Sequence, residues 1–274
     1  MEAVLINIED FEHSGEGGLG ESLNHKTNPN LLLKLYESKA RADAVLTELE
    51  NARKAYSLGI PTPKPGEFVT DGNGRYGMLF ERIVGKCSVA RAVGDNPDKV
   101  EYYARRFAGM CRQLHSTHIP EGMFPNVKDH YRALLNKIPH YTPEERARIE
   151  EVIDNAPDGD TAIHGDLQFG NMIMVGDKNY FIDLGYFTCG APEFDLGMVL
   201  FTSMYDNPTF LREVFHMEPA TAAEFWKYFV KGYYGEDADP KEIELKLRPY
   251  AMLKLLIMEE YFGALTEYHW LFKA

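Results

Sequence analysis

The sequence contains the stretch His164-Gly165-Asp166-Leu167-Gln168-Phe169-Gly170-Asn171, and Ile182-Asp183-Leu184-Gly185 follows it. A carboxylate and an amide lie five residues apart at Asp166 and Asn171, and a second carboxylate, Asp183, comes two residues before a glycine. Each motif alone is ordinary turn chemistry, because Gly, Asp and Asn are common turn residues. In this order and combination, they indicate a site that gathers oxygen-bearing side chains.

A predicted β-hairpin separates the two motifs. Asn171–Val175 and Asn179–Asp183 are strand-like, and Gly176-Asp177-Lys178 joins them as a turn. Because a hairpin returns on itself, its ends can bring Asn171 and Asp183 to one metal ion. Oxygen ligands of this kind suit Mg²⁺.

The spacing from Asp166 to Asn171 is that of the catalytic loop of protein kinases, in which a later Asp holds magnesium. Phosphoryl transfer needs one carboxylate to accept the proton of the acceptor hydroxyl. It also needs oxygen ligands that hold Mg²⁺ across the nucleotide phosphates. We therefore expect Asp166 to be the catalytic base, and Asn171 and Asp183 to bind the metal.

A glycine-rich segment lies near the N-terminus. Residues 15–20 match Gly-x-Gly-x-x-Gly, a pattern that also marks dinucleotide-binding folds, in which a helix follows directly. Here a polar turn and the apolar strand Leu31–Tyr36 follow instead, which is the arrangement of a glycine-rich loop that covers ATP phosphates. We expect Gly17 and Gly20 to belong to that loop.

Lys34 is the one charged residue of the apolar run Leu31–Tyr36. A buried ammonium needs a partner, and in a kinase such a lysine touches the phosphates and pairs with a helix glutamate. The next segment, residues 42–58, has apolar residues at helical spacing and offers Glu48 and its rival Glu50. We take Glu48 as the partner; an edge lysine beside solvated glutamates is the alternative.

Strand signals are concentrated in the first third of the chain. The segments concerned are Val4–Ile8, Leu31–Tyr36 and Tyr76–Val84. Beyond Gly85 the pattern is mainly helical, with one helix expected from Asn96 to His118. The sequence therefore predicts an α+β fold, with a nucleotide-binding lobe over residues 1–85 and a helical lobe over residues 86–274 that holds the catalytic loop and the acceptor site.

With these motifs, the chain resembles the aminoglycoside phosphotransferase and choline kinase superfamily of small-molecule kinases. The matching stretches are His164–Asn171, Ile182–Gly185, Leu58–Pro63 and Met78–Gly85. The resemblance implies a protein-kinase-like bilobal fold, with a small β-sheet lobe that contains one helix and a larger, mainly helical lobe.

The resemblance also implies roles for individual residues. It gives Asp166, Asn171, Asp183, Lys34 and Glu48 the roles stated above. The main chain around Glu81 and Ile83 would bind adenine, and Phe80 would line the base pocket. Asp195 and His164 match positions that hold the scaffold.

Three features depart from the resembled pattern. Phe169 stands where proline is frequent, and Leu184 stands where Phe or Trp is common, so the match does not single out antibiotic kinases. Ala191-Pro192-Glu193 spells the triplet that closes a protein-kinase activation segment, but only five residues separate it from Gly185. An activation loop and a peptide-docking surface need more chain, so we expect a small-molecule acceptor.

Composition excludes several kinds of partner. The chain has 274 residues and a net charge of −13, which disfavours nucleic acid and anionic lipid. No apolar stretch approaches the roughly 18 to 20 residues of a membrane span, and the N-terminus lacks a basic signal-peptide region. Cys87, Cys111 and Cys189 form no Cys-x-x-Cys, which favours a reduced, cytoplasmic setting.

Together these patterns predict an ATP- and Mg²⁺-dependent kinase that phosphorylates a hydroxyl of a small molecule, with cationic acceptors such as an aminoglycoside or an amino alcohol as candidates. GTP in place of ATP, the identity of the acceptor and the oligomeric state stay open. The aromatic stretch 261–272, with Glu259 before it, either packs as a terminal helix or meets an acceptor cation. The alternative functions are a nucleotide-binding module without catalysis and a protein kinase.

Overall fold

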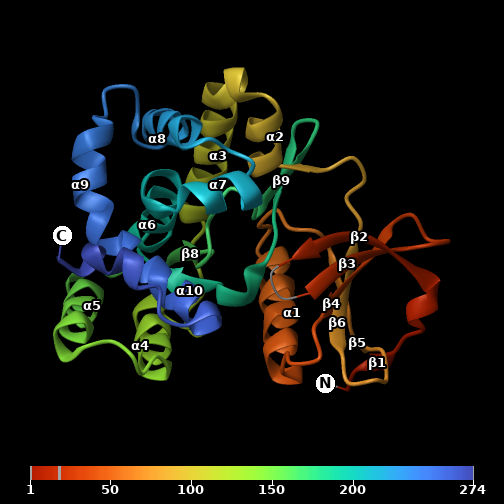
Figure 1. The fold of residues 1–274 in the computed structure, drawn as a ribbon. Coiled ribbons are helices and arrows are strands. Elements are labelled where there is room, and N and C mark those ends of the chain that lie inside the picture. Colours follow the sequence, from red (N-terminus) through yellow and green to blue (C-terminus); the bar gives the residue numbers. More distant parts are fainter. Residues whose placement is uncertain (1, 18–19, 274) are drawn as a thin grey trace. The chain divides into compact units, whose positions relative to one another are not determined.

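The computed structural model describes residues 2–17 and 20–273 (Figure 1). The chain forms two compact units. The strand-rich unit consists of Met1–Cys87 and Ile173–Tyr186, and the helical unit consists of Ser88–Met172 and Phe187–Ala274. The nucleotide and acceptor roles expected of residues 1–85 and 86–274 stay predictions.

A six-stranded sheet with the order β1-β5-β6-β4-β3-β2 dominates the strand-rich unit. Its strands are β1 (Val4–Leu5), β2 (Phe11–Gly17), β3 (Gly20–His25), β4 (Leu31–Tyr36), β5 (Pro65–Thr70) and β6 (Tyr76–Glu81). β1 pairs in parallel with β5, and all other neighbours are antiparallel. Short connections permit the antiparallel pairs, whereas a parallel pair needs a longer crossover.

Helix α1 (Ala42–Ser57) packs on one face of this sheet, as Figure 1 shows. Successive residues of a strand point to opposite faces. Leu33 and Leu35 lie in a core cluster on one side, and Tyr36 lies in the other cluster with Val45 of α1. Lys34 alternates with the two leucines and therefore shares the helix-covered face with Tyr36.

The predicted hairpin is present as β9 (Met172–Val175) and β10 (Lys178–Phe181). Gly176 in the turn has a φ of 53°, a left-handed conformation that glycine adopts without strain. With β7 (Cys87–Ser88) these strands form a sheet of order β10-β9-β7. β10 ends before Asp183, which was expected inside the strand and instead lies in the loop before the short helix η3 (Leu184–Tyr186).

Several local predictions in the strand-rich unit need correction. Of Val4–Ile8 only the first two residues form a strand, and Ile8–Asp10 forms the 3-10 helix η1. The strand expected to reach Val84 ends at Glu81. β2, β3 and β5 were not predicted, because the first two are rich in polar residues and glycine and the third begins with Pro-Gly. They are strands because each pairs with a neighbour in the sheet, and pairing outweighs local propensity.

The helical unit contains α2 (Val89–Asp95), α3 (Val100–His115), α4 (Val127–Lys137), α5 (Pro143–Asn155), α6 (Glu193–Leu200), α7 (Pro208–Val214), α8 (Pro219–Tyr234), α9 (Pro240–Ala251) and α10 (Leu253–Phe262). Shorter segments are the 3-10 helices η2 (Pro97–Lys99) and η5 (Thr266–Lys273), the π-helical η4 (Phe201–Tyr205), and the paired strands β8 (Thr161–Ile163) and β11 (Thr188–Gly190). The helix expected from Asn96 to His118 is therefore η2 followed by α3. No helix in the described part of the chain is both long enough and apolar enough to cross a membrane.

An aromatic cluster anchors the loop that carries Asp166. Phe169 is fully buried, and its ring centre lies 6.3 Å from that of Phe107 in α3 and 4.7 Å from that of Phe225 in α8. Both contacts are edge-to-face, the geometry that aromatic pairs prefer. Phe169 thus packs the loop against two helices. A proline, which is frequent at this position in the resembled family, could not make these aromatic contacts.

Candidate active site

Lys34 lies between two carboxylates of the strand-rich unit. Its Nζ donates to Glu48 Oε1 at 2.7 Å and also to Asp183. The hydroxyl of Tyr36 donates to the other oxygen of Glu48, and Lys34 Nζ lies 5.1 Å from the centre of the Tyr36 ring. Glu50 is exposed, so Glu48 is the glutamate of α1 that pairs with Lys34.

The charges around Lys34 keep it protonated. Burial by itself lowers the pKa of an ammonium group, but the carboxylates of Asp183 and Glu48 more than offset this, and the pKa of Lys34 lies well above its ordinary value. A lysine that stays charged and is held by a helix glutamate can bind the phosphates of a nucleotide.

Asp183 has a strained backbone and an accessible side chain. Its φ is 62°, in the left-handed region that residues other than glycine adopt only occasionally. Asn51 of α1 holds the next residues by donating its Nδ2 to Leu184 O at 3.0 Å and to Gly185 O at 3.3 Å. The Asp183 side chain is 44% exposed. Strain that presents an accessible carboxylate points to a functional position.

Asp195 organises the main chain of the loop His164–Asn171 in the helical unit. Its fully buried carboxylate accepts the N–H groups of His164 at 2.7 Å and Gly165 at 2.9 Å. His115 Nε2 lies 3.2 Å from the same carboxylate. His164 Nδ1 in turn accepts the N–H of Asp166 at 3.3 Å. Asp195 and His164 therefore shape the loop from within the protein.

Asp166 has two side-chain partners. Lys254 of α10 donates its Nζ to Asp166 Oδ1, and Asn171 donates its Nδ2 to Asp166 Oδ2 at 3.0 Å and to Asp166 O at 2.8 Å. Because both amide hydrogens of Asn171 are directed to Asp166, its amide oxygen is the atom left for a cation. An amide oxygen is a hard donor of the kind that Mg²⁺ takes, and the metal-binding roles expected of Asn171 and Asp183 stay predictions.

Lys254 keeps Asp166 ionised. Burial raises the pKa of a carboxyl group, but the ammonium of Lys254, assisted by His164 and the hydrogen bond from Asn171, holds the pKa of Asp166 below its ordinary value. An ionised carboxylate is the form that can accept a proton from an acceptor hydroxyl.

Lys254 was missed by the sequence prediction. It lies 88 residues from Asp166 along the chain, so no spacing rule connects the two. A signal was nevertheless present, because Lys254 is the one charge in the apolar run Met252–Met258. The same pattern, one lysine inside a buried apolar run, had singled out Lys34.

The glycine-rich turn connects β2 to β3. Gly17 pairs with Gly20 across the hairpin, and Gly18 and Leu19 between them lie outside the described residues. Packing requires glycine at position 20, because a Cβ there would lie 2.3 Å from Leu35 O in β4. The structure thus places the two predicted phosphate-binding glycines at the end of one hairpin.

The segment after β6 was expected to bind adenine. Phe80 packs against the cluster between the sheet and α1, and Glu81 is exposed. The Glu81 N–H donates to Lys64 O at 2.9 Å, so this amide is already engaged. The adenine-binding role expected of the main chain around Glu81 and Ile83 stays a prediction.

Asp206, at the end of η4, is a second carboxylate influenced by Lys254. It is buried, accepts the N–H of Asn207 at 2.8 Å and accepts the hydroxyl of Tyr268 at 3.2 Å. Burial raises its pKa to about 6, although the ammonium of Lys254 and these hydrogen bonds act in the opposite direction. Of the C-terminal aromatics, Tyr268 and Phe272 are buried, whereas Tyr261, Phe262 and Trp270 are exposed, so the packing interpretation holds for only part of the stretch.

Comparisons with known proteins identify the family of the chain and its fold. A family model described as the phosphotransferase enzyme family matches residues 22–225. No curated protein matches the sequence at a significant level. Among solved structures, the chain is similar to an aminoglycoside-3'-phosphotransferase of type VIII, with 20% identity and a TM-score of 0.63 over 90% of this chain and 94% of that one.

Two further structures are similar over most of the chain. A thermostable mutant of an aminoglycoside phosphotransferase, in ternary complex with ADP and hygromycin B, has 12% identity and a TM-score of 0.65 over 96% of this chain and 91% of that one. A choline/ethanolamine kinase family protein from Mesorhizobium loti has 17% identity and a TM-score of 0.53 over 90% of this chain and 76% of that one. These matches confirm the predicted α+β, protein-kinase-like fold and the resemblance drawn from the sequence.

Proposed function

The chain belongs to the phosphotransferase enzyme family, and on this premise we propose that it is a kinase that transfers the γ-phosphoryl group of ATP to a hydroxyl of a small molecule. The observation that carries the proposal is the cluster of Lys34, Glu48 and Asp183. The cluster combines a lysine for the phosphates, the helix glutamate that holds this lysine, and a loop carboxylate for Mg²⁺, which are the groups that bind a Mg²⁺-nucleotide in kinases.

The nucleotide would be held by the strand-rich unit. Lys34 binds phosphate oxygens while Glu48 fixes its position, and the turn at Gly17 and Gly20 supplies main-chain N–H groups to the phosphates. Ile83 donates its amide to the base. A divalent cation, held by the oxygens of Asp183 and Asn171, would neutralise charge on the transferring phosphoryl group.

Asp166 would accept the proton of the acceptor hydroxyl as the oxygen attacks phosphorus. Its ionised form, maintained by Lys254, is the competent one. Asn171 orients the carboxylate through its amide hydrogens, so that the base and one metal ligand belong to the same eight-residue loop.

The acceptor would carry no cation close to its reacting hydroxyl. Two like charges 4 Å apart repel by about 4 kcal/mol at an effective dielectric constant of 20, and Lys254 places an ammonium against Asp166. This disfavours choline-like acceptors, whose cation is a few bonds from the hydroxyl. It is compatible with larger acceptors, such as aminoglycosides, whose ammonium groups can lie farther away, and with neutral or anionic ones.

We place the reaction in the cytoplasm, where ATP is available and the three cysteines stay as thiols.

The proposal is tested by measuring ADP release with Mg²⁺-ATP across amino alcohols, aminoglycosides, sugars and nucleosides. We expect turnover with one class, no turnover in Asp166→Asn with nucleotide binding retained, and loss of Mg²⁺-nucleotide binding in Asp183→Ala. Wild-type protein that binds no nucleotide in the presence of Mg²⁺ would overturn the proposal. Binding without turnover on any acceptor would favour the non-catalytic module.

A further inference from the structure

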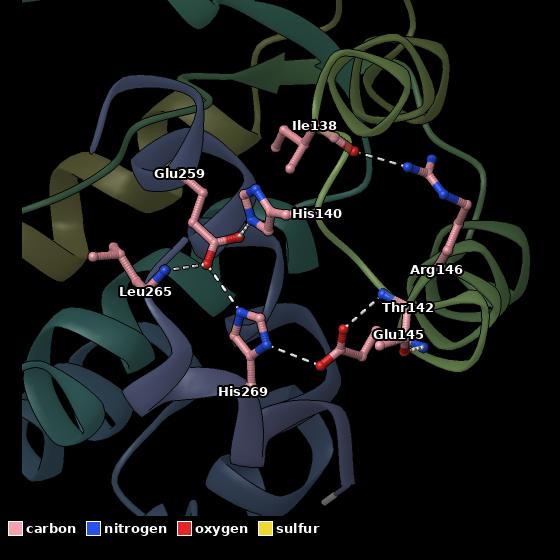
Figure 2. A network of polar contacts seen from close by, with 8 residues as sticks. All are labelled: Ile138, His140, Thr142, Glu145, Arg146, Glu259, Leu265 and His269. Carbon is pink, nitrogen blue, oxygen red and sulfur yellow. Dashed lines mark hydrogen bonds and ion pairs between the residues drawn. The ribbon is translucent and has the colours of Figure 1, made fainter. Parts of the chain in front are cut away.

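Three potential metal ligands converge in the helical unit outside the site described above (Figure 2). His140 lies in the loop before α5, Glu259 on α10 and His269 on η5. His140 Nε2 lies 3.0 Å from Glu259 Oε2, and His269 Nε2 lies 3.0 Å from Glu259 Oε1. The ligand atoms all lie within 4.8 Å of one another.

His269 has a carboxylate at each of its ring nitrogens. Glu145 Oε1 lies 2.8 Å from Nδ1, and Glu259 Oε1 lies 3.0 Å from Nε2 (Figure 2). A neutral imidazole has one N–H and can donate to only one of them. The second nitrogen therefore needs either a proton of its own or a metal ion between it and the carboxylate oxygen.

We propose that His140, Glu259 and His269 bind one divalent transition-metal ion, for which Zn²⁺ is the best fit. Two imidazole nitrogens and one carboxylate are a ligand set that Zn²⁺ takes, usually with a water in the fourth position. Tetrahedral Zn²⁺ with bonds of about 2.0 to 2.1 Å separates neighbouring ligand atoms by about 3.4 Å. The two nitrogen–oxygen separations here are shorter than that by only a few tenths of an ångström.

The surroundings supply an outer shell and a route of entry. Metal-bound histidines usually donate their other N–H to a carboxylate, which fixes the tautomer. Glu145 occupies that position toward His269 Nδ1, and its second oxygen accepts the Thr142 N–H at 2.9 Å, which fixes the carboxylate. The Glu259 side chain is fully buried and His140 is 27% exposed, so an ion reaches the site from the side of His140.

The ion would join three segments that are distant in sequence. It would link η5 and the loop before α5 to α10, the helix that also carries Lys254. We therefore expect its main effect on stability rather than on chemistry. The inference does not depend on the proposed phosphotransfer reaction.

The test uses full-length protein freed of metal with a chelator and titrated with Zn²⁺ and Co²⁺. We expect one ion per chain by calorimetry, visible Co²⁺ absorption bands typical of four-coordinate nitrogen and oxygen ligation, and a rise in Tm of roughly 5 °C when Zn²⁺ is at a hundredfold its Kd. Mg²⁺ should produce none of these effects. Wild-type protein that binds no Zn²⁺ would overturn the proposal and leave a hydrogen-bonded histidine network.

Variants distinguish this site from incidental binding by surface histidines. His140→Ala, at the exposed edge of the cluster, should weaken Zn²⁺ binding by more than about a hundredfold, and Glu145→Gln by about ten- to a hundredfold through the outer shell. The matched control is His118→Ala, which removes an exposed histidine paired with Asp160 and should bind Zn²⁺ like the wild type. Equal Zn²⁺ affinity in His140→Ala and His118→Ala, both with native circular dichroism, would contradict the assignment.

Discussion

At the scale of single residues, one lysine in each unit pairs with a carboxylate that was predicted to act in the reaction. Each interrupts an apolar run, and each pairs with a carboxylate, Lys34 with Asp183 and Lys254 with Asp166. A charged group in a buried apolar run requires a partner, so such a run predicts that an anionic side chain lies close to the lysine. The sequence cannot say which anion, because the partners are 149 and 88 residues away.

Removal of the Lys254 charge should move the pH dependence of catalysis. Lys254 lowers the pKa of Asp166, so in Lys254→Met the pKa of the base rises, and the base ionises only at higher pH. We expect the acidic limb of the kcat/KM profile to shift upward by about one pH unit or more. Lys254→Arg keeps a positive charge and should leave the limb near its wild-type position. An unshifted limb in Lys254→Met would mean that Lys254 does not act on the base.

Glu48 and Glu50 provide a matched pair on α1. Glu48 accepts a charged hydrogen bond from Lys34 at 2.7 Å, whereas Glu50 is exposed. Loss of a charged hydrogen bond costs about 1.5 to 3 kcal/mol, so Glu48→Gln should weaken Mg²⁺-ATP binding about tenfold or more. Glu50→Gln should bind like the wild type. Calorimetric titration with a non-hydrolysable ATP analogue measures both, and equal affinities would contradict the assigned role of Glu48.

At the scale of elements, the sequence predicts best where periodicity and burial coincide. β4 and α1 appear within a residue of the expected bounds, because each has one clearly apolar face. β2, β3 and β5 are strands through their partners rather than their composition, and no local pattern marks them. The helix expected to begin at Asn96 begins as α3 only at Val100, because Asn96-Pro97 opens a single 3-10 turn before it.

The contact of the loop His164–Asn171 with α3 and α8 depends on Phe169. Its ring is fully buried among Phe107 and Phe225, so Phe169→Ala should destabilise the protein by about 3 to 5 kcal/mol through lost burial and a cavity. Phe262→Ala removes a phenylalanine that is 68% exposed and should cost less than about 0.5 kcal/mol. Urea unfolding followed by tryptophan fluorescence measures both. Equal losses would show that the loop is not held by the aromatic cluster.

At the scale of the whole molecule, the α+β class follows from where strand and helix signals lie along the chain. The strand-rich unit nevertheless includes Ile173–Tyr186, which comes late in the sequence. Its membership depends on contacts such as that from Phe181 N–H to Pro61 O at 2.8 Å. Main-chain contacts of this kind have no sequence signature. The sequence therefore predicts a single boundary after residue 85, whereas each unit of the structure consists of two segments.

The pH dependence of stability provides a prediction about the folded molecule as a whole. Burial raises the pKa of Asp206 to about 6 from an ordinary value of 3.8. Below about pH 4 the group is protonated in both the folded and the unfolded state, and folding is not penalised. As the pH rises toward 6, the unfolded chain ionises while the folded protein holds its proton, so this group lowers the free energy of unfolding by up to about 3 kcal/mol above pH 6.

Asp206→Asn removes this titration and keeps the shape of the side chain. The Asn oxygen can still accept the Asn207 N–H and the Tyr268 hydroxyl, which both bond to one oxygen of Asp206. The variant should therefore gain stability over the wild type as the pH rises from 4 to 7, by up to about 3 kcal/mol. Urea unfolding at intervals across this range measures the gain, with the exposed Asp237→Asn as a control for surface charge. A difference between Asp206→Asn and wild type that is constant with pH would mean that the pKa of Asp206 is not raised in the folded protein.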